Sequence, residues 1–216
     1  ASLTGLKKGG VMRTFEIGAA WAGPLFIVVL VGAFAAMGFI PPIAPSLGAE
    51  ATAAYYEEHR TIIRVGATLV MQFSFCMFFW VAAISAQIRR IESPHARLLS
   101  YSQMLFGLGA NLVFVLMAVG FTVAAFRPER SAELVQLMND FAWLVLVMPV
   151  FPLTFQAVSM GLAALVDQRA EPVFPRWSAY MNFWIGLLFL PGHNLKPRAH
   201  AAFSAPRTVR QSRWAG

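Results

Sequence analysis

The sequence predicts an all-α, multipass transmembrane helical bundle. Of its 216 residues, 58% are hydrophobic and only 12% are charged, which is about half the charged share of a typical soluble domain. Five runs lack Asp, Glu, Lys and Arg, and four of them comfortably exceed the roughly 20 apolar residues that a spanning helix needs. Hydrocarbon offers the backbone no hydrogen-bond partner, so these runs have to be helical. The composition therefore excludes a soluble enzyme domain, a disordered chain and a disulfide scaffold.

The expected spans form one membrane domain over residues 1–195. They lie at about 17–40, 65–88, 98–126 and 137–166, with a marginal fifth at 177–195. The first charge-free run has 24 residues, too many for the apolar part of a signal peptide, so it is interpreted as an uncleaved span. Prolines at 41, 42 and 45 are expected to end it, and residues 46–64 to form a short polar helix that leads into the second span.

The ends of the later spans are marked by capping residues and prolines. Ser93 and Pro94 are expected to begin the third span. The loop before them is so short that the second and third spans have to be antiparallel neighbours. Ser131 is expected to begin the fourth helix, and Pro149 and Pro152 to kink it.

The distribution of charge predicts an orientation. With the N-terminus inside, the inner segments hold eight basic and four acidic residues, and the outer loops hold four basic and six acidic residues. An excess of Lys and Arg marks the cytoplasmic side. The sequence therefore predicts a cytoplasmic N-terminus, in a membrane of the bacterial cytoplasmic type.

A weak internal repeat relates two inner loops and the helices that follow them. Seven positions between Arg90 and Leu108 match positions between Arg169 and Leu187 at an offset of 79 residues. One interpretation is a duplicated two-helix hairpin, related by an axis along the membrane normal. The other is coincidence, since Arg at the inner boundary and Gly within membranes are both common.

Residues 196–216 form a basic tail that is expected to be disordered. The tail carries five basic and no acidic residues, so the net charge of +7 falls to +2 without it. If the fifth run spans the membrane, this tail lies outside, against the charge rule. Three explanations stay open: a re-entrant or interfacial fifth helix, a basic segment that binds anionic lipid, or a disrupted reading frame that replaced a sixth helix.

Uncharged polar residues near the middle of three spans are the first candidate site. At similar depths lie Gln72, Ser74, Asn111, Thr154 and Gln156, with the single cysteine, Cys76, beside them. They would either line a polar cavity for a small ligand or act as hydrogen-bond glue between helices. Glue is the simpler interpretation, because such contacts are common in membrane bundles.

A polar mouth on the outer side is the second candidate site, and its residues before the second span are Glu57, Glu58, His59 and Arg60. Deeper in, Arg64 and Asp140 lie close to the hydrocarbon boundary, where charges are usually paired. We expect an ion pair between them. The alternative is an ordinary exposed charged face.

Candidate chemistry is limited by the residues that the spans lack. No histidine lies in the middle of a span to hold haem, no histidine accompanies the intramembrane serines, and the carboxylates lie near the boundaries. No catalytic residue, metal site, cofactor or nucleic-acid partner is expected. The sequence favours a non-enzymatic accessory, scaffold, or small-solute or lipid-handling protein. Its partners would be the lipid bilayer, and other membrane subunits or a second copy. The alternative is a membrane-embedded enzyme or redox subunit that uses the outer mouth.

Overall fold

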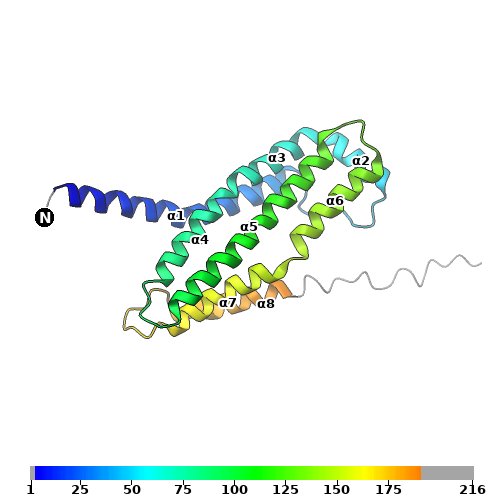
Figure 1. The fold of residues 1–216 in the computed structure, drawn as a ribbon. Coiled ribbons are helices and arrows are strands. Elements are labelled where there is room, and N and C mark those ends of the chain that lie inside the picture. Colours follow the sequence, from blue (N-terminus) through cyan, green and yellow to red (C-terminus); the bar gives the residue numbers. More distant parts are fainter. Residues whose placement is uncertain (1–2, 191–216) are drawn as a thin grey trace, which may run out of the picture.

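The computed structural model describes residues 3–190, with side chains from Met12 onward, and this part of the chain consists of helices joined by loops, without strands (Figure 1). The helices are α1 (Leu3–Ala36), α2 (Ala49–Glu58), α3 (Arg60–Phe73), α4 (Phe75–Ile88), α5 (Ala96–Phe126), α6 (Ala132–Val147), α7 (Val150–Val166) and α8 (Arg176–Phe189). Four stretches are long and apolar enough to cross a membrane: Met12–Ala36, Arg60–Ile88, Ala96–Phe126 and Ala132–Val166. The predicted helical membrane bundle is confirmed, and four spans are found.

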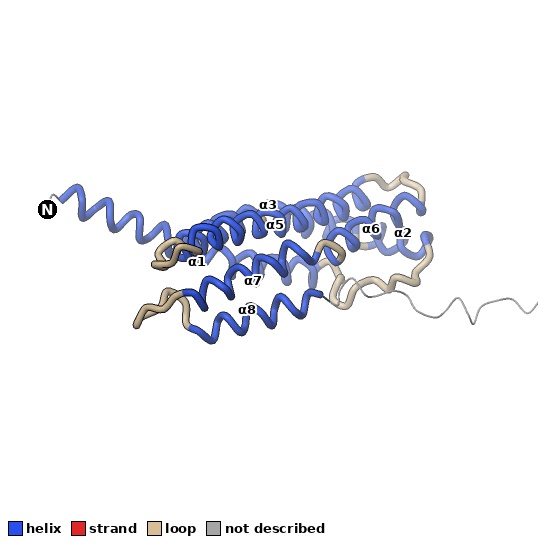
Figure 2. Tube along the Cα trace, turned by 60° about the horizontal axis from the view of Figure 1, so that its bottom comes forward, coloured by secondary structure: helices blue, strands red, loops and turns tan. Residues whose placement is uncertain are grey.

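Helix α5 lies at the centre of the bundle. It packs against α3, α4, α6 and α7, while α1 packs on α3 and α4, and α8 packs on α7. Figures 1 and 2 show these helices side by side, with the first part of α1 extending beyond the others. We call the end that holds α2 the α2 end, and the end that holds residues 89–95 and 167–175 the loop end.

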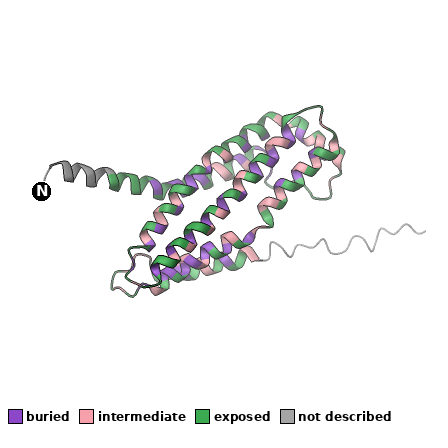
Figure 3. Ribbon diagram, viewed as in Figure 1, coloured by how far each residue is buried: buried purple, intermediate pink, exposed green. Residues whose placement is uncertain are grey.

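Apolar side chains cover the outside of the bundle as well as its interior. Buried residues lie on the faces that adjoin other helices, and exposed residues follow the outer faces (Figure 3). Many of the exposed side chains are large and hydrophobic, among them Val28, Leu105 and Leu188. An apolar surface of this extent is suited to lipid.

Helix α1 ends earlier than the prolines predicted, at a glycine. Gly38 has a φ of +70°, and its backbone N–H donates to Ala35 O at 3.1 Å, while that of Phe39 donates to Phe34 O at 2.9 Å. These two bonds form a Schellman motif, which satisfies carbonyls that the helix would leave unpaired. The prediction that Pro41 ends the helix was wrong, because the hydrogen-bonded glycine turn comes first.

The turn at Gly38 places Phe39 in an aromatic cluster at the α2 end. Phe39 is 1% exposed, and its ring lies 4.7 Å from that of Phe121 in α5 and 5.6 Å from that of Trp143 in α6. Phe34 contacts the same rings. Aromatic pairs at these separations stabilise packing beyond their buried area. The cluster therefore ties the end of α1 to α5 and α6.

Two spans are each divided into two helices. The second is interrupted at Ser74, whose hydroxyl donates to Met71 O at 2.7 Å. The fourth is interrupted at Pro149, where the Val150 N–H donates to Met148 O at 2.9 Å in a tight turn. The predicted kink at Pro149 is confirmed, since proline supplies no backbone N–H and clashes with the preceding turn. Pro152 lies in the first turn of α7, where proline is tolerated.

Other predicted ends are shifted by a few residues. The polar helix expected over 46–64 is the separate helix α2 followed by the start of α3, with His59 between them. Helix α5 begins at Ala96, and Ser93 Oγ accepts a hydrogen bond from the His95 N–H at 3.3 Å. Ser131 caps α6 as expected by position, although its hydroxyl makes no capping bond.

The marginal fifth span corresponds to α8, which is too short to count among the spans found. Its 14 residues extend about 21 Å at about 1.5 Å per residue, against a hydrocarbon core of about 30 Å. It runs back along α7 from the loop end. The end of the predicted span and the predicted tail, residues 191–216, lie outside the described residues.

Helix boundaries agree with the predicted hairpin repeat. Adding the offset of 79 to Ile88, where α4 ends, gives 167, one residue past the end of α7. Adding it to Ala96, where α5 begins, gives 175, one residue before the start of α8. The α4–α5 and α7–α8 pairs are thus equivalent hairpins in outline, and a shared origin stays a prediction.

Replacing Gly38 by alanine should destabilise the protein. A Cβ there would clash with the Tyr55 hydroxyl, which donates to Met37 O at 2.7 Å. The left-handed backbone adds to the cost, so we expect a loss of about 1–3 kcal/mol, measured as a lower thermal midpoint in detergent by circular dichroism. Gly32→Ala is the matched control, because a Cβ at this helical glycine meets no atom within 4 Å. Equal midpoints for the two variants would contradict the role of Gly38.

Candidate functional site

The five residues of the predicted polar layer do not meet in one cluster. Gln72 is exposed on the outside of α3, so its expected place inside the bundle was wrong. Ser74 is buried but bonds within its own span. Thr154 is buried and its hydroxyl donates to Gly186 O of α8 at 3.3 Å. The remaining two, Asn111 of α5 and Gln156 of α7, are buried.

Serine and glutamine side chains join α4 and α5 near the loop end. The Ser100 hydroxyl donates to Ser85 O at 2.9 Å, and the Ser85 hydroxyl donates to Gln103 Oε1 at 2.5 Å. All three residues are at most 5% exposed. These bonds act as the interhelical glue that was expected of Gln72, Ser74, Asn111, Thr154 and Gln156.

Three amide side chains lie at one face of α5, which contacts both α4 and α7. Gln103, Gly107 and Asn111 are four residues apart, so they share one face of α5. A Cβ on Gly107 would come within 2.7 Å of Gln156 Nε2, which places the Gln156 amide against this face. We call Gln103, Asn111 and Gln156 the amide row. Gln103 was not among the residues predicted for the polar layer, although its spacing of four and eight residues from Gly107 and Asn111 is visible in the sequence.

The amide row contains buried polar atoms that have no partner. Gln103 Nε2, Gln156 Nε2 and both side-chain polar atoms of Asn111 make no hydrogen bond within the described part of the chain. The exposed fractions are 0% for Gln103, 1% for Asn111 and 5% for Gln156. The interpretation of the layer as helix glue therefore fails for these atoms.

The outer mouth is a real cavity at the α2 end. Its volume is about 270 Å³, and its walls come from α2, the end of α5 and the start of α6. The lining includes Glu50, Glu57, Arg60, Arg127 and Arg130. Glu57 pairs with Arg60, and Glu129 with Arg127 at 3.5 Å. The cavity thus carries both signs of charge, and two of its three arginines are in ion pairs.

The predicted ion pair between Arg64 and Asp140 is not formed. Arg64 lies on the outer face of α3, 5.6 Å from the centre of the Phe126 ring. Asp140, on α6, accepts a hydrogen bond from Asn139 Nδ2 at 3.2 Å. Helices α3 and α6 each pack on α5, which separates the two charges. A second groove of about 420 Å³ follows α3 from Thr61 past Arg64 to Leu69.

Residues of α2 beside the mouth are held by a hydrogen bond and by a ring stack. The Tyr56 hydroxyl donates to Asn139 Oδ1 at 3.0 Å, and burial, with contributions from Tyr55 and Asp140, raises the pKa of Tyr56. The phenol therefore stays a neutral donor. His59 stacks on Tyr55 with ring centres 4.2 Å apart. Glu58 is exposed and contributes to a raised pKa of Tyr55, of which burial is the larger cause. These contacts fix α2 over the bundle.

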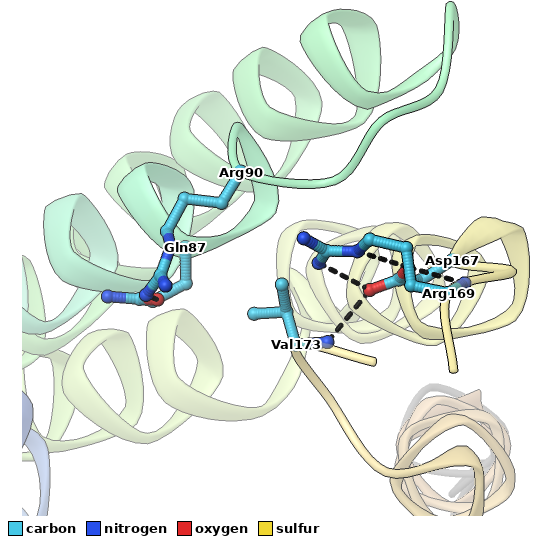
Figure 4. Close-up of polar contacts among 5 residues, drawn as sticks. All are labelled: Gln87, Arg90, Asp167, Arg169 and Val173. Atoms are coloured by element: carbon cyan, nitrogen blue, oxygen red, sulfur yellow. Dashed lines mark hydrogen bonds and ion pairs between the residues drawn. The ribbon is translucent and has the colours of Figure 1, made fainter. Parts of the chain in front are cut away.

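A buried carboxylate organises the loop between α7 and α8 (Figure 4). Asp167, 1% exposed, accepts hydrogen bonds from Arg169 Nε at 2.9 Å, from Arg169 Nη2 at 2.8 Å and from the Val173 N–H at 2.8 Å. The hydrogen bonds from Arg169, helped by the backbone N–H groups, hold the pKa of Asp167 well below its usual range. This site shapes a loop and leaves no carboxylate oxygen open to a ligand.

The described residues contain no cluster of side chains that could bind a metal ion. No group of three His, Cys, Asp or Glu side chains lies close enough together to hold an ion. Cys76 is buried beside an apolar groove of about 690 Å³ between α1 and α4. The arrangements that stand out are therefore the amide row and the arginine-lined mouth.

Comparison with known proteins gives no relative from which residues could be carried over. No protein-family model, no curated protein sequence and no solved structure matches this chain.

Replacing Asp167 by asparagine should destabilise the loop end. Asparagine cannot hold Arg169 as a counterion, and hydrogen bonds to charged groups contribute about 1.5–3 kcal/mol each, so we expect a clearly lower thermal midpoint at pH 7. Because the pKa of Asp167 is lowered on folding, its contribution is complete above the ordinary carboxyl pKa of about 4 and is lost as the pH falls below it.

The difference between wild type and Asp167→Asn should therefore shrink on acidification. Thermal midpoints in detergent at pH 7 and pH 3 measure this. Glu171→Gln, an exposed carboxylate in the same loop, should change neither midpoint. A constant difference at both pH values would show that the charge of Asp167 is not what matters.

Proposed function

We propose that the protein is a non-enzymatic membrane protein that binds phospholipid, with an anionic head group on Arg64. The observation that carries this proposal is the environment of the Arg64 guanidinium. Among the described residues it has an aromatic ring, Phe126, beside it and no carboxylate. A charge at the hydrocarbon boundary is normally paired or reaches toward the head groups. Phosphate oxygens match the donor geometry of a guanidinium and supply the missing countercharge.

The adjoining cavity fits the polar part of such a lipid. Arg60 and Arg127 are occupied by Glu57 and Glu129, and Arg130 donates to Val123 O at 2.8 Å. These arginines are held in place by their partners, and the acidic residues at this end outnumber the basic ones by six to four. The attraction of an anionic head group therefore rests on its contact with Arg64, and such attraction amounts to about 1 kcal/mol for each Lys or Arg.

The outer face of α3 fits the acyl part. The groove that contains Thr61 and Arg64 is lined farther along α3 by Val65, Thr68 and Leu69. Val65 is 50% exposed and Leu69 is 42% exposed. A chain attached to a head group on Arg64 would lie along this face and cover apolar surface. Arg64 would therefore contact the head group, and Val65 and Leu69 would contact the acyl chain attached to it.

The proposal extends to orientation and location. The excess of basic residues at the loop end supports a cytoplasmic N-terminus, which places Arg64 in the outer leaflet. We propose a bacterial-type cytoplasmic membrane as the location, and other membrane subunits or a second copy as further partners.

Replacing Arg64 by glutamine should weaken binding of an anionic phospholipid. From about 1 kcal/mol per arginine we expect about fivefold weaker binding of phosphatidylglycerol to the purified full chain, measured by native mass spectrometry. Phosphatidylcholine binding should change less. Arg90→Gln is the matched control, because it removes the same charge from an exposed arginine at the other end of the bundle, where Arg90 Nη1 donates to Gln87 at 2.7 Å.

The comparison of these variants decides the proposal. A loss confined to Arg64→Gln and to the anionic lipid supports a head-group site. Equal losses in both variants would mean general attraction to positive charge, and unchanged binding in Arg64→Gln would mean that the site is elsewhere.

A further inference from the structure

The amide row is an exception in the interior of the bundle. Other buried polar side chains are bonded: Ser85 and Ser100 to one another's helices, Thr154 to Gly186 O, and Ser159 to Phe155 O. The amide row instead leaves four polar atoms without partners in the described residues. The indole N–H of Trp143 is also unpartnered, but it belongs to the aromatic cluster at the α2 end.

Unpaired amides at this depth are costly. Leaving a buried donor or acceptor unsatisfied costs about 1–3 kcal/mol, and hydrocarbon offers no replacement partner. Apolar residues would pack α5 against α7 without this cost. The three amides thus suit a different state, in which a ligand supplies the hydrogen bonds that are absent in this closed structure.

Gln103 and Asn111 lie on the face of α5 that carries Gly107, and the Gln156 amide lies against that face. Gly107 stands in the middle of the row, and a Cβ there would come within 2.7 Å of Gln156 Nε2 on one side and of Val81 Cγ2 on the other. A seam therefore runs between α4, α5 and α7. The missing side chain of Gly107 is what lets the Gln156 amide reach α5.

Helix α7 packs on α8 and is separated from α6 by the interruption at Pro149. Gly161 lies against the Phe183 ring, where a Cβ would come within 2.7 Å, and Thr154 bonds to Gly186 O. The helical hydrogen bonding between α6 and α7 is interrupted at Pro149. Pro149 and Pro152 have no backbone N–H, so neither donates a hydrogen bond to α6. A groove of about 580 Å³ beside this break is lined by Met148, Pro149 and Pro152 together with residues of α5 and α6. The α7–α8 pair can therefore turn as one body about Pro149.

The chemistry of the row selects its ligand. All three side chains are amides, so nothing in the row neutralises a charged ligand. Of the four unpartnered atoms, three are NH₂ nitrogens and one is a carbonyl oxygen, so the row mostly donates. We propose that the seam binds a small uncharged solute with hydroxyl or carbonyl oxygens, admitted when the α7–α8 pair swings away from α5 about Pro149.

Thiol reactivity tests this proposal in the full chain in lipid vesicles, with Cys76→Ala as background. The probes are hydroxyethyl methanethiosulfonate, which is small and uncharged, and its trimethylammonium counterpart, which is cationic. The test position is Asn111→Cys. Met117→Cys, on the same helix and 1% exposed, is the buried control, and Gln168→Cys, exposed in the α7–α8 loop, is the reference for full access.

We expect the uncharged probe to modify Asn111→Cys at least about tenfold faster than Met117→Cys, since reactivity scales with the open population. After normalisation to Gln168→Cys, the cationic probe should react about tenfold more slowly at position 111 than the uncharged one. Adding Pro149→Ala and Pro152→Ala should slow modification of Asn111→Cys several-fold and leave Gln168→Cys unchanged.

Three results would overturn the proposal. If the uncharged probe modifies Asn111→Cys no faster than Met117→Cys, the seam is closed and dry. Equal normalised rates for the two probes would show that the seam does not select against charge. Unchanged rates after the two proline substitutions would show that Pro149 is not a hinge. If Asn111→Cys does not fold, Gln156→Cys tests the same seam from α7 with the same controls.

Discussion

Because hydrocarbon gives a polar group no partner, every amide and hydroxyl within the spans has to be bonded by the protein itself. This constraint accounts for much of the structure. It makes the apolar runs helical, and it favours an end of α1 at Gly38, where two backbone bonds close the last turn. It also explains the paired Ser85 and Ser100 bonds between α4 and α5. At the loop end, Asp167 is buried only because Arg169 and Val173 satisfy it.

The departures from this constraint are few, and they lie in different surroundings. Arg64 is exposed at the boundary, where a lipid phosphate can complete its contacts. The amide row is enclosed between helices, where nothing can complete its contacts unless α7 moves. The break at Pro149 and the tight pairing of α7 with α8 provide a way for such a movement to occur without unfolding either helix. One site therefore depends on the bilayer and the other on a change of conformation.

The fold class, the four spans and the kink at Pro149 could be predicted from the sequence, because they depend on apolar length and on the missing N–H of proline. The face that each helix buries could not. In a soluble helix the apolar face marks the core, whereas here both lipid and core are apolar, so nothing marked Gln72 as exposed or Gln103 as buried. The ion pair between Arg64 and Asp140 was expected only because both residues lie at a similar depth in the membrane. The sequence did not show that α5 lies between their helices.

Separation of the α7–α8 pair from α5, with the rest of the bundle closed, can be measured by amide hydrogen exchange of the full chain in lipid nanodiscs, resolved by helix. We expect faster exchange over the first turns of α7, next to Pro149, and over α5 around Asn111, than over α3 and α4. Equal protection of α3, α4, α5 and α7 on the same timescale would contradict it.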